Sequence, residues 1–370
     1  MDLAAYAALR YLGETKSVFF RIRPATSDEQ IARWYQGSPF HVRWGFDISE
    51  KWKGQFGNRK GAEYSAKDVF QLKVFGDSFA FGAGMNDLET FEALIEEQTG
   101  WEVLNYGVVG YGTDQALLKY VDNDIRTKYT VLTVLDENIE RNVTMCRGLL
   151  TGTLGLLPKP RFEATADGSM TLRENPLKNV SELKKLKDLT FLESLKEHDY
   201  WAKYYGKLNA PTELQWPATV TLIGHLDYFL GVAARQMRYN LMPSYESHYA
   251  RWPHNHLYEE GSEGIKVLRH ILGQFADAAA AKHETPIVLI FPKRETMQIV
   301  QSYHKKPYQS LVDSLKADAL RFIDFGDVFI DKNWPEYYIE DGHYSRAGNK
   351  VIANELISLI RQLEQQSDVR

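Results

Sequence analysis

The chain has 370 residues, of which 44% are hydrophobic, 25% charged and 13% aromatic. This composition is typical of a folded globular protein and excludes disorder as the default interpretation. The formal net charge of -5 argues against nucleic-acid binding as the main activity, because that activity usually requires a basic surface. Cys146 is the sole cysteine, so the sequence excludes an intrachain disulfide and a cysteine-ligated zinc site.

The first residues give no indication of secretion. They lack a basic segment ahead of an apolar run, and Arg10 interrupts the apolar residues, so we expect a cytoplasmic location. The longest apolar stretch, residues 218–234, carries His225 and Asp227 and is too short for a comfortable bilayer span. We therefore predict a buried helix there and no integral membrane segment. Residues 1–70 as a whole, with an irregular stretch rich in Trp, Gly, Arg and Lys, are expected to form an N-terminal cap region.

After the cap region, strand patterns alternate with helix patterns. Short β-prone runs predict strands at residues 71–76, 101–106 and 130–135, and the last of these is continuously apolar, as expected for a strand that is buried on both faces. Helices are predicted at residues 90–99 and from residue 113 onward. Strands that alternate with helices indicate an α/β layer fold with a parallel sheet.

The alternation stops at residues 145–261 and then resumes. That segment carries Lys, Glu and Leu at helical spacing, as in residues 181–198, and it is predicted to be a helical insertion that could act as a lid or as a substrate or partner surface. Beyond it, helices are predicted at residues 264–282, 308–318 and 345–365, and strands at 286–291 and 321–324. Residues 71–144 and 262–370 should therefore form one three-layer α/β/α sandwich around a mostly parallel sheet of five strands.

Three segments near predicted strand ends supply the residue types of acyl transfer. Ser78 follows the first strand, where Gly76 allows a tight turn that would expose the hydroxyl. A serine hydroxyl is a weak nucleophile, so it needs a base within hydrogen-bond reach and a group that orients the base. His343 and Asp341 can meet this need, because residues two apart in an extended loop project to the same side. The catalytic residues predicted are therefore Ser78, His343 and Asp341.

Attack on an ester carbonyl also requires hydrogen-bond donors for the oxyanion. The backbone N–H groups of Ser78 and Gly110 and the side-chain amide of Asn138 are the candidates. Each also has a purely structural interpretation: glycine and asparagine are common in turns, and Asp and Ser commonly cap helices.

These residues resemble, in order and type, the four blocks of the SGNH or GDSL hydrolase family. Gly76-Asp77-Ser78 matches the first block, Gly110 the second, Asn138 the third, and Asp341 with His343 the last. The resemblance covers residues 71–142 and about 285–362. It implies a flavodoxin-like SGNH hydrolase fold and a serine esterase that acts through an acyl-enzyme, on an O-acetylated carbohydrate as in many relatives.

The sequence departs from the family pattern at two places. Asp341 and His343 are two residues apart where three is usual, and the third block reads Asp136-Glu137-Asn138-Ile139 where Gly-x-Asn-Asp is usual. Two alternatives to an esterase stay open. One is an O-acyltransferase that passes the acyl group to a sugar hydroxyl, and the other is a non-catalytic carbohydrate- or partner-binding protein.

No cofactor or metal is predicted. Gly82-Ala83-Gly84 begins like a dinucleotide fingerprint, but Asp87 occupies the third glycine position. His254 and His256 lack a third ligand at a persuasive spacing. The expected ligand is a small-molecule or carbohydrate ester, and the sequence leaves the oligomeric state open.

Overall fold

The computed structural model describes residues 24–61, 69–147, 157–165 and 167–368, together with residues 2, 3, 5–7 and 9. The chain divides into two compact units. Met1–Asp47 and Val143–Asn255 form the first unit, and Ile48–Asn142 and His256–Arg370 form the second, here named the sheet unit. Within the described ranges, no helix has the length and apolar character needed to cross a membrane.

The sheet unit is built on five parallel strands in the order β4-β3-β5-β8-β9. Numbered along the chain, this order is 2-1-3-4-5, which is the flavodoxin-like arrangement. The predicted five-stranded, mostly parallel sheet is therefore confirmed. The strands are β3 (Phe70–Phe75), β4 (Val103–Asn105), β5 (Thr127–Leu135), β8 (Thr285–Phe291) and β9 (Phe322–Asp324).

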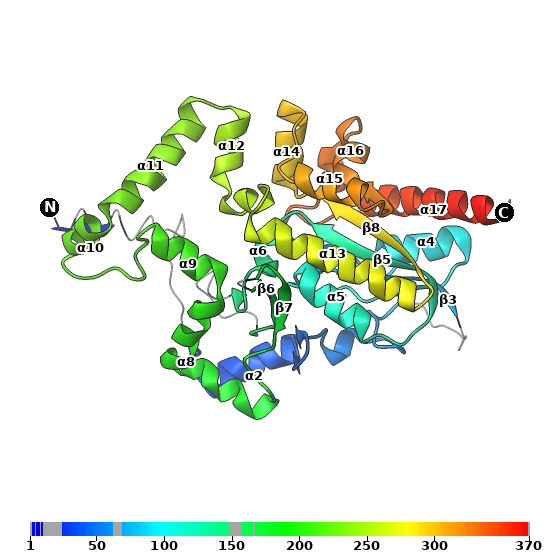
Figure 1. The fold of residues 1–370 in the computed structure, drawn as a ribbon, viewed down its shortest axis with the longest axis horizontal. Helices are drawn as coiled ribbons and strands as arrows, with labels where there is room; N and C mark the ends of the chain where they lie inside the picture. The colour runs from blue at the N-terminus through cyan, green and yellow to red at the C-terminus, as the bar shows by residue number, and fades with distance from the viewer. Residues whose placement is uncertain are drawn as a thin grey trace. The chain divides into compact units, whose positions relative to one another are not determined.

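Helices cover both faces of this sheet. Successive side chains of a strand point to opposite faces, so Leu72 and Val74 join the core with α4 (Phe91–Thr99) and α17 (Arg346–Asp368). On the other face, Phe75 contacts Tyr120 of α5 (Thr113–Val121), which in turn contacts α13 (Glu263–Ala281). Figure 1 shows α5 and α13 on one side of the sheet and α4 and α17 on the other. The three-layer α/β/α prediction is confirmed.

The remaining helices of this unit are short. α15 (Gln309–Ala317) lies at the predicted position, whereas α14 (Arg294–Tyr303) and α16 (Phe325–Ile330) have no counterpart among the predictions. α16 begins at once after β9, and Asp324 both ends the strand and caps the helix, so no turn signal separates them. The other elements are η1 (Glu50–Trp52), α3 (Ser78–Phe81), α6 (Asn138–Asn142) and η5 (Trp334–Tyr337).

Residues 48–61, which lie inside the predicted cap region, belong to the sheet unit. The backbone N–H of Arg59 donates to the carbonyl of Asn105 at 2.6 Å. Its guanidinium donates to the carbonyls of Phe81 and Met85 and pairs with Asp87 at 3.0 Å. This buried arginine ties the segment to the loop after α3.

The first unit is mainly helical and contains two antiparallel hairpins, β1 (Phe40–His41) with β2 (Gly45–Phe46) and β6 (Arg161–Ala164) with β7 (Met170–Arg173). Its helices are α2 (Asp28–Gly37), η2 (Val180–Lys187), α8 (Leu189–Ser194), η3 (Leu195–His198), α9 (Tyr200–Lys207), α10 (Ala218–Gly224), α11 (Leu226–Leu241) and α12 (Tyr245–Arg251). η4 (Pro253–Tyr258) contains the boundary between residues 255 and 256.

Two helix predictions in this unit need correction. Residues 181–198 are not one helix, because Asp188 ends η2 and caps α8 with its side chain. Residues 218–234 are not a buried helix. The helix breaks at His225, and Ile223 and Leu230 are 73% and 60% exposed. The stretch is apolar in composition, but its apolar side chains lie on both faces, and only Ala218, Thr221, Tyr228 and Phe229 are buried.

Candidate active site

Ser78 lies at the carboxyl edge of the sheet, at the first position of the short helix α3. The side chain of Asp77 caps this helix by accepting from the backbone N–H of Phe79 at 2.8 Å. The first N–H groups of a helix have no acceptor within the helix, so α3 begins with donors that point toward its amino end. Ser78 follows β3, next to β5, which is the switch point at which doubly wound sheets bind ligands.

Gly76 is required by the close approach of β5. A Cβ atom at this position would lie 1.9 Å from the Oγ1 of Thr133 and 2.8 Å from the Cβ of Ala80. Any side chain would therefore push α3 away from the sheet. Gly76 is needed because no side chain fits between α3 and β5, and not because its backbone adopts a conformation that only glycine favours.

His343 is held on a tight turn near the end of the chain. Tyr338 and Tyr344 form an antiparallel bridge, and within it the N–H of Ile339 donates to the carbonyl of His343 at 2.8 Å. The predicted extended loop is thus wrong in detail: the turn, and not strand-like alternation, brings Asp341 beside His343. Gly342 has φ 90° and nothing within 4 Å of its Cβ position, so the site needs it for its left-handed backbone and not to relieve crowding.

The three predicted catalytic side chains form a continuous chain of contacts. Nε2 of His343 lies 2.9 Å from Oγ of Ser78, and Nδ1 of His343 lies 3.0 Å from Oδ1 of Asp341. An ionised carboxylate only accepts hydrogen bonds, so Nδ1 carries the hydrogen and Nε2 presents its lone pair to the serine. The structure brings together two residues that are 265 positions apart in the sequence.

Further contacts fix the imidazole and the carboxylate. The ring of Phe79 packs against that of His343 with a centroid separation of 5.0 Å. Although partial burial opposes it, hydrogen bonds from the backbone and side chain of His343 lower the pKa of Asp341. Asp341 therefore remains ionised and able to orient the ring at neutral pH. Its side chain is 58% exposed, so solvent screens its charge.

The predicted glycine segment runs beside the nucleophile. The N–H groups of Tyr106 and Val108 donate to the carbonyls of Val74 and Gly76, which continues the pairing of β4 with β3 toward the site. A Cβ at Gly107 would lie 2.3 Å from the backbone nitrogen of Phe81, so this segment presses on α3. Gly110 follows with φ 89°, in a turn closed by the N–H of Tyr111 and the carbonyl of Val108.

Asn138 is fully buried, and it contacts the residue next to the nucleophile. Its Nδ2 donates to Oδ2 of Asp77 at 2.8 Å. A side-chain amide carries two N–H donors, so one remains beyond the donor that Asp77 accepts. Burial raises the pKa of Asp77, while Arg141 and the hydrogen bonds from Phe79 and Asn138 oppose this rise.

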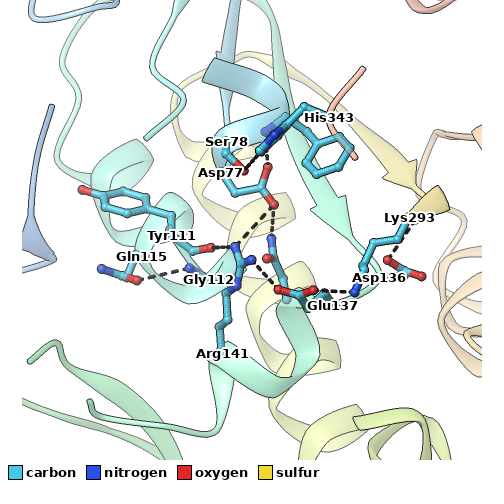
Figure 2. Close-up of polar contacts among 12 residues, drawn as sticks. Asp77, Ser78, Tyr111, Gly112, Gln115, Asp136, Glu137, Arg141, Lys293 and His343 are labelled. Carbon is cyan, nitrogen blue, oxygen red and sulfur yellow. Dashed lines mark hydrogen bonds and ion pairs between the residues drawn. The ribbon is translucent and has the colours of Figure 1, made fainter. Parts of the chain in front are cut away.

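A chain of buried and partly buried charges continues from Asp77 (Figure 2). Arg141 lies 3.9 Å from Asp77 and 2.6 Å from Glu137, and Lys293 pairs with the other oxygen of Glu137 at 2.6 Å. The backbone N–H of Lys293 donates to Asp136 at 3.2 Å. Although burial alone lowers the pKa of Arg141, Glu137 and Asp77 raise it above its usual value, so its charge is permanent.

Sequence motifs alone do not point to a role for Asp77, Arg141, Glu137 or Lys293. One signal was available: Asn138 and Arg141 are three residues apart on α6, a spacing that places both side chains on one face of a helix. Across the described parts of the chain, no group of three or more His, Cys, Asp or Glu side chains is placed to hold a metal ion. The chemistry that this arrangement can perform is nucleophilic attack by a serine with an adjacent base.

Comparisons with known proteins find a distant likeness among solved structures alone. No protein-family model matches the chain, and no curated protein matches it either. Among solved structures, the chain is similar to a proposed lipolytic protein of the G-D-S-L family from Desulfitobacterium hafniense DCB-2, with a TM-score of 0.37 and 9% identity over 77% of this chain and 96% of the other. The function proposed below therefore depends on the geometry of the chain's own side chains.

Proposed function

We propose that the protein is a serine esterase that hydrolyses an acyl ester through an acyl-enzyme. The observation that carries the proposal is the contact chain from Ser78 through His343 to Asp341, with heavy-atom distances of 2.9 and 3.0 Å. These distances are within the range in which a base takes a proton from a nucleophile. A protein that merely kept the fold would have no need for this alignment, so the contact chain favours catalysis over a binding role alone.

The steps of the reaction follow from the hydrogen-bond donors and acceptors around Ser78 and His343. His343 accepts the Ser78 proton at Nε2 as the serine oxygen attacks the ester carbon, and Asp341 stabilises the imidazolium through Nδ1. The oxyanion would be held by the N–H groups of Ser78 and Gly110 and by the free N–H of Asn138. His343 then returns the proton to the leaving alcohol. Water, activated by the same imidazole, releases the acid and restores the serine.

For the substrate we propose a short acyl group, acetyl, on a carbohydrate hydroxyl. The support is the resemblance of the four sequence blocks to hydrolases that include many carbohydrate esterases. A panel of p-nitrophenyl acetate, butyrate and octanoate would rank the acyl chain, and an acetylated polysaccharide would test the alcohol. If turnover of the acetyl ester rises severalfold on addition of a sugar acceptor, with transfer of acetyl to that sugar, the protein is an O-acyltransferase that uses the same acyl-enzyme.

The proposal is tested by comparing Ser78→Ala with Ser358→Ala. Ser358 is an exposed serine on α17, so its loss should leave activity unchanged. Ser78→Ala and His343→Ala should each lower kcat by about 10⁴-fold or more, because triad members act as a unit. Full activity of folded Ser78→Ala on every ester of the panel would overturn the proposal.

A further inference from the structure

We infer that Arg141 is a positioning residue that sets the oxyanion site by fixing Gly110 and Asn138 relative to each other. The inference rests on the proposed function. Among the described residues, Arg141 forms no hydrogen bond or ion pair with Ser78 or His343, so its effect would pass through other groups.

The first of these groups is the glycine turn. Nη1 of Arg141 donates to the backbone carbonyl of Tyr111 at 3.0 Å, and Tyr111 immediately follows Gly110. Figure 2 shows the guanidinium between Tyr111 and Glu137. Because Gly110 has the left-handed φ of 89°, its peptide units have few steric restraints of their own. The arginine supplies a restraint at the next carbonyl and so fixes the direction of the turn.

The second group is Asp77. The same nitrogen lies 3.9 Å from Oδ2 of Asp77, the oxygen that accepts from Asn138. A cation at this distance favours the ionised form of the buried carboxylate, in opposition to the burial that raises its pKa. The ionised carboxylate in turn holds the amide of Asn138 with its nitrogen toward Asp77. Without the cation, Asp77 would favour its protonated form and could donate to Asn138, which would allow the amide to reverse.

The third group anchors the arginine. Nη2 of Arg141 donates to Glu137 at 2.6 Å, and Glu137 is held from its other side by Lys293, which immediately precedes α14. A guanidinium is planar and offers five N–H donors in a fixed fork, so one group can meet the Tyr111 carbonyl and the Glu137 carboxylate at once. A lysine ammonium has a single nitrogen and cannot keep both contacts in the same geometry.

The experiment compares Arg141→Lys and Arg141→Ala with the wild type, with enzyme concentrations set by active-site titration. Misplaced oxyanion donors weaken binding of the transition state only, so kcat should fall while KM changes less than twofold. We expect a loss of about tenfold for Arg141→Lys and about 10²-fold for Arg141→Ala, the size of one lost oxyanion donor. The affinity of a boronic acid, which forms a tetrahedral adduct on Ser78, should fall by a similar factor.

Guanidinium chloride at a concentration well below unfolding provides a second measurement. It should restore part of the kcat of Arg141→Ala, relative to equal sodium chloride, by filling the space that the side chain leaves. If Arg141→Ala does not fold, Arg141→Lys and Glu137→Gln provide the same test. Glu284→Gln is the matched control, because it breaks the buried Lys73–Glu284 pair of 2.8 Å at the amino edge of the sheet. It should lower stability and leave kcat per titrated site unchanged.

The outcomes separate this inference from the proposed function. If wild type is active and all Arg141 variants keep kcat and boronic-acid affinity per folded site within twofold, Arg141 is structural only and this inference is overturned. If wild type has no esterase or acyl-transfer activity, the proposed function itself has failed.

Discussion

The two sides of Ser78 are built in opposite ways. The base comes from a short surface turn, where the side chains of His343 and Asp341 are 24% and 58% exposed. The oxyanion side comes from groups inside the sheet unit, where Asp77 and Asn138 are fully buried. Removing one partner of an exposed contact costs little stability, whereas removing one partner of a buried charge pair leaves the other charge uncompensated, so the two sides should differ in what a substitution changes. We expect a change to the side chain of His343 or Asp341 to alter activity alone, and a change to a buried charge in the interior to alter activity together with stability.

Among the variants that compare the two sides, Asp341→Asn on the exposed side should have the largest effect. Asparagine can donate to the ring and can hold His343 in the wrong tautomer, so kcat should fall by about 10³-fold or more. Since Asp341 is exposed, the free energy of unfolding should change by less than about 0.5 kcal/mol. Steady-state kinetics and chemical denaturation measure both. A stability loss of about 3 kcal/mol, the size expected for Asp77→Asn, would show that the exposed and buried sides do not differ in this way.

Asp77→Asn, on the buried side, should lower both kcat and stability. Arg141 loses a charge partner, and the amide of Asn138 faces another amide, so kcat should fall by about 10²-fold. Breaking a buried charge pair should also destabilise the fold by about 3 kcal/mol. Asp87→Asn is the matched control, because it removes the 42% exposed partner of another buried arginine, Arg59. Equal small stability losses in the two variants would show that burial does not set the cost.

Gly342→Ala tests whether the backbone of the turn positions the base. The left-handed φ of 90° should cost alanine about 1 kcal/mol, and the open space around the Cβ position excludes a clash as the cause. Gly100→Ala is a matched control, with φ 71° and equally open space at the end of α4. Both variants should lose similar stability by denaturation. Only Gly342→Ala should lower kcat, by about tenfold for a displacement of the base of roughly 1 Å or less.

The smallest effect on activity is expected from Glu92, a buried carboxyl on α4. Burial raises the pKa of Glu92 to about 8 from the ordinary value of 4.5. Between these two pH values the folded protein holds a proton that the unfolded chain releases, so stability is full below about 4.5 and is lost as pH rises toward about 8. The slope contributed is at most about 1.4 kcal/mol per pH unit.

Glu92→Gln removes the group that exchanges this proton. From pH 5 to pH 9 the free energy of unfolding should therefore fall less steeply than in the wild type, with kcat unchanged. Glu97→Gln, at an exposed position of the same helix, should keep the wild-type slope. If the free energy of unfolding of Glu92→Gln fell with pH as steeply as that of the wild type, Glu92 would not be the group that holds the proton.

The contrast between the exposed turn and the buried interior also explains which parts of the site could be predicted from the sequence. The strands and most helices of the sheet unit follow from apolar periodicity, and Ser78, Asp341 and His343 follow from short motifs whose members lie close together in sequence. The role of Arg141 does not, because its partners Tyr111, Asp77 and Glu137 come from three segments that meet only after the sheet forms. The failed prediction of a buried helix at residues 218–234 has another cause: composition does not tell which faces of a helix find partners.

The site at which a fluorophosphonate reacts with the folded protein tests most directly whether Ser78 is a nucleophile activated by His343. We expect a single adduct that peptide mass spectrometry places on Ser78, that forms at least about 10³-fold more slowly in His343→Ala, and that is absent in Ser78→Ala. An adduct on another residue, or labelling of Ser78 at the same rate with and without His343, would contradict this expectation.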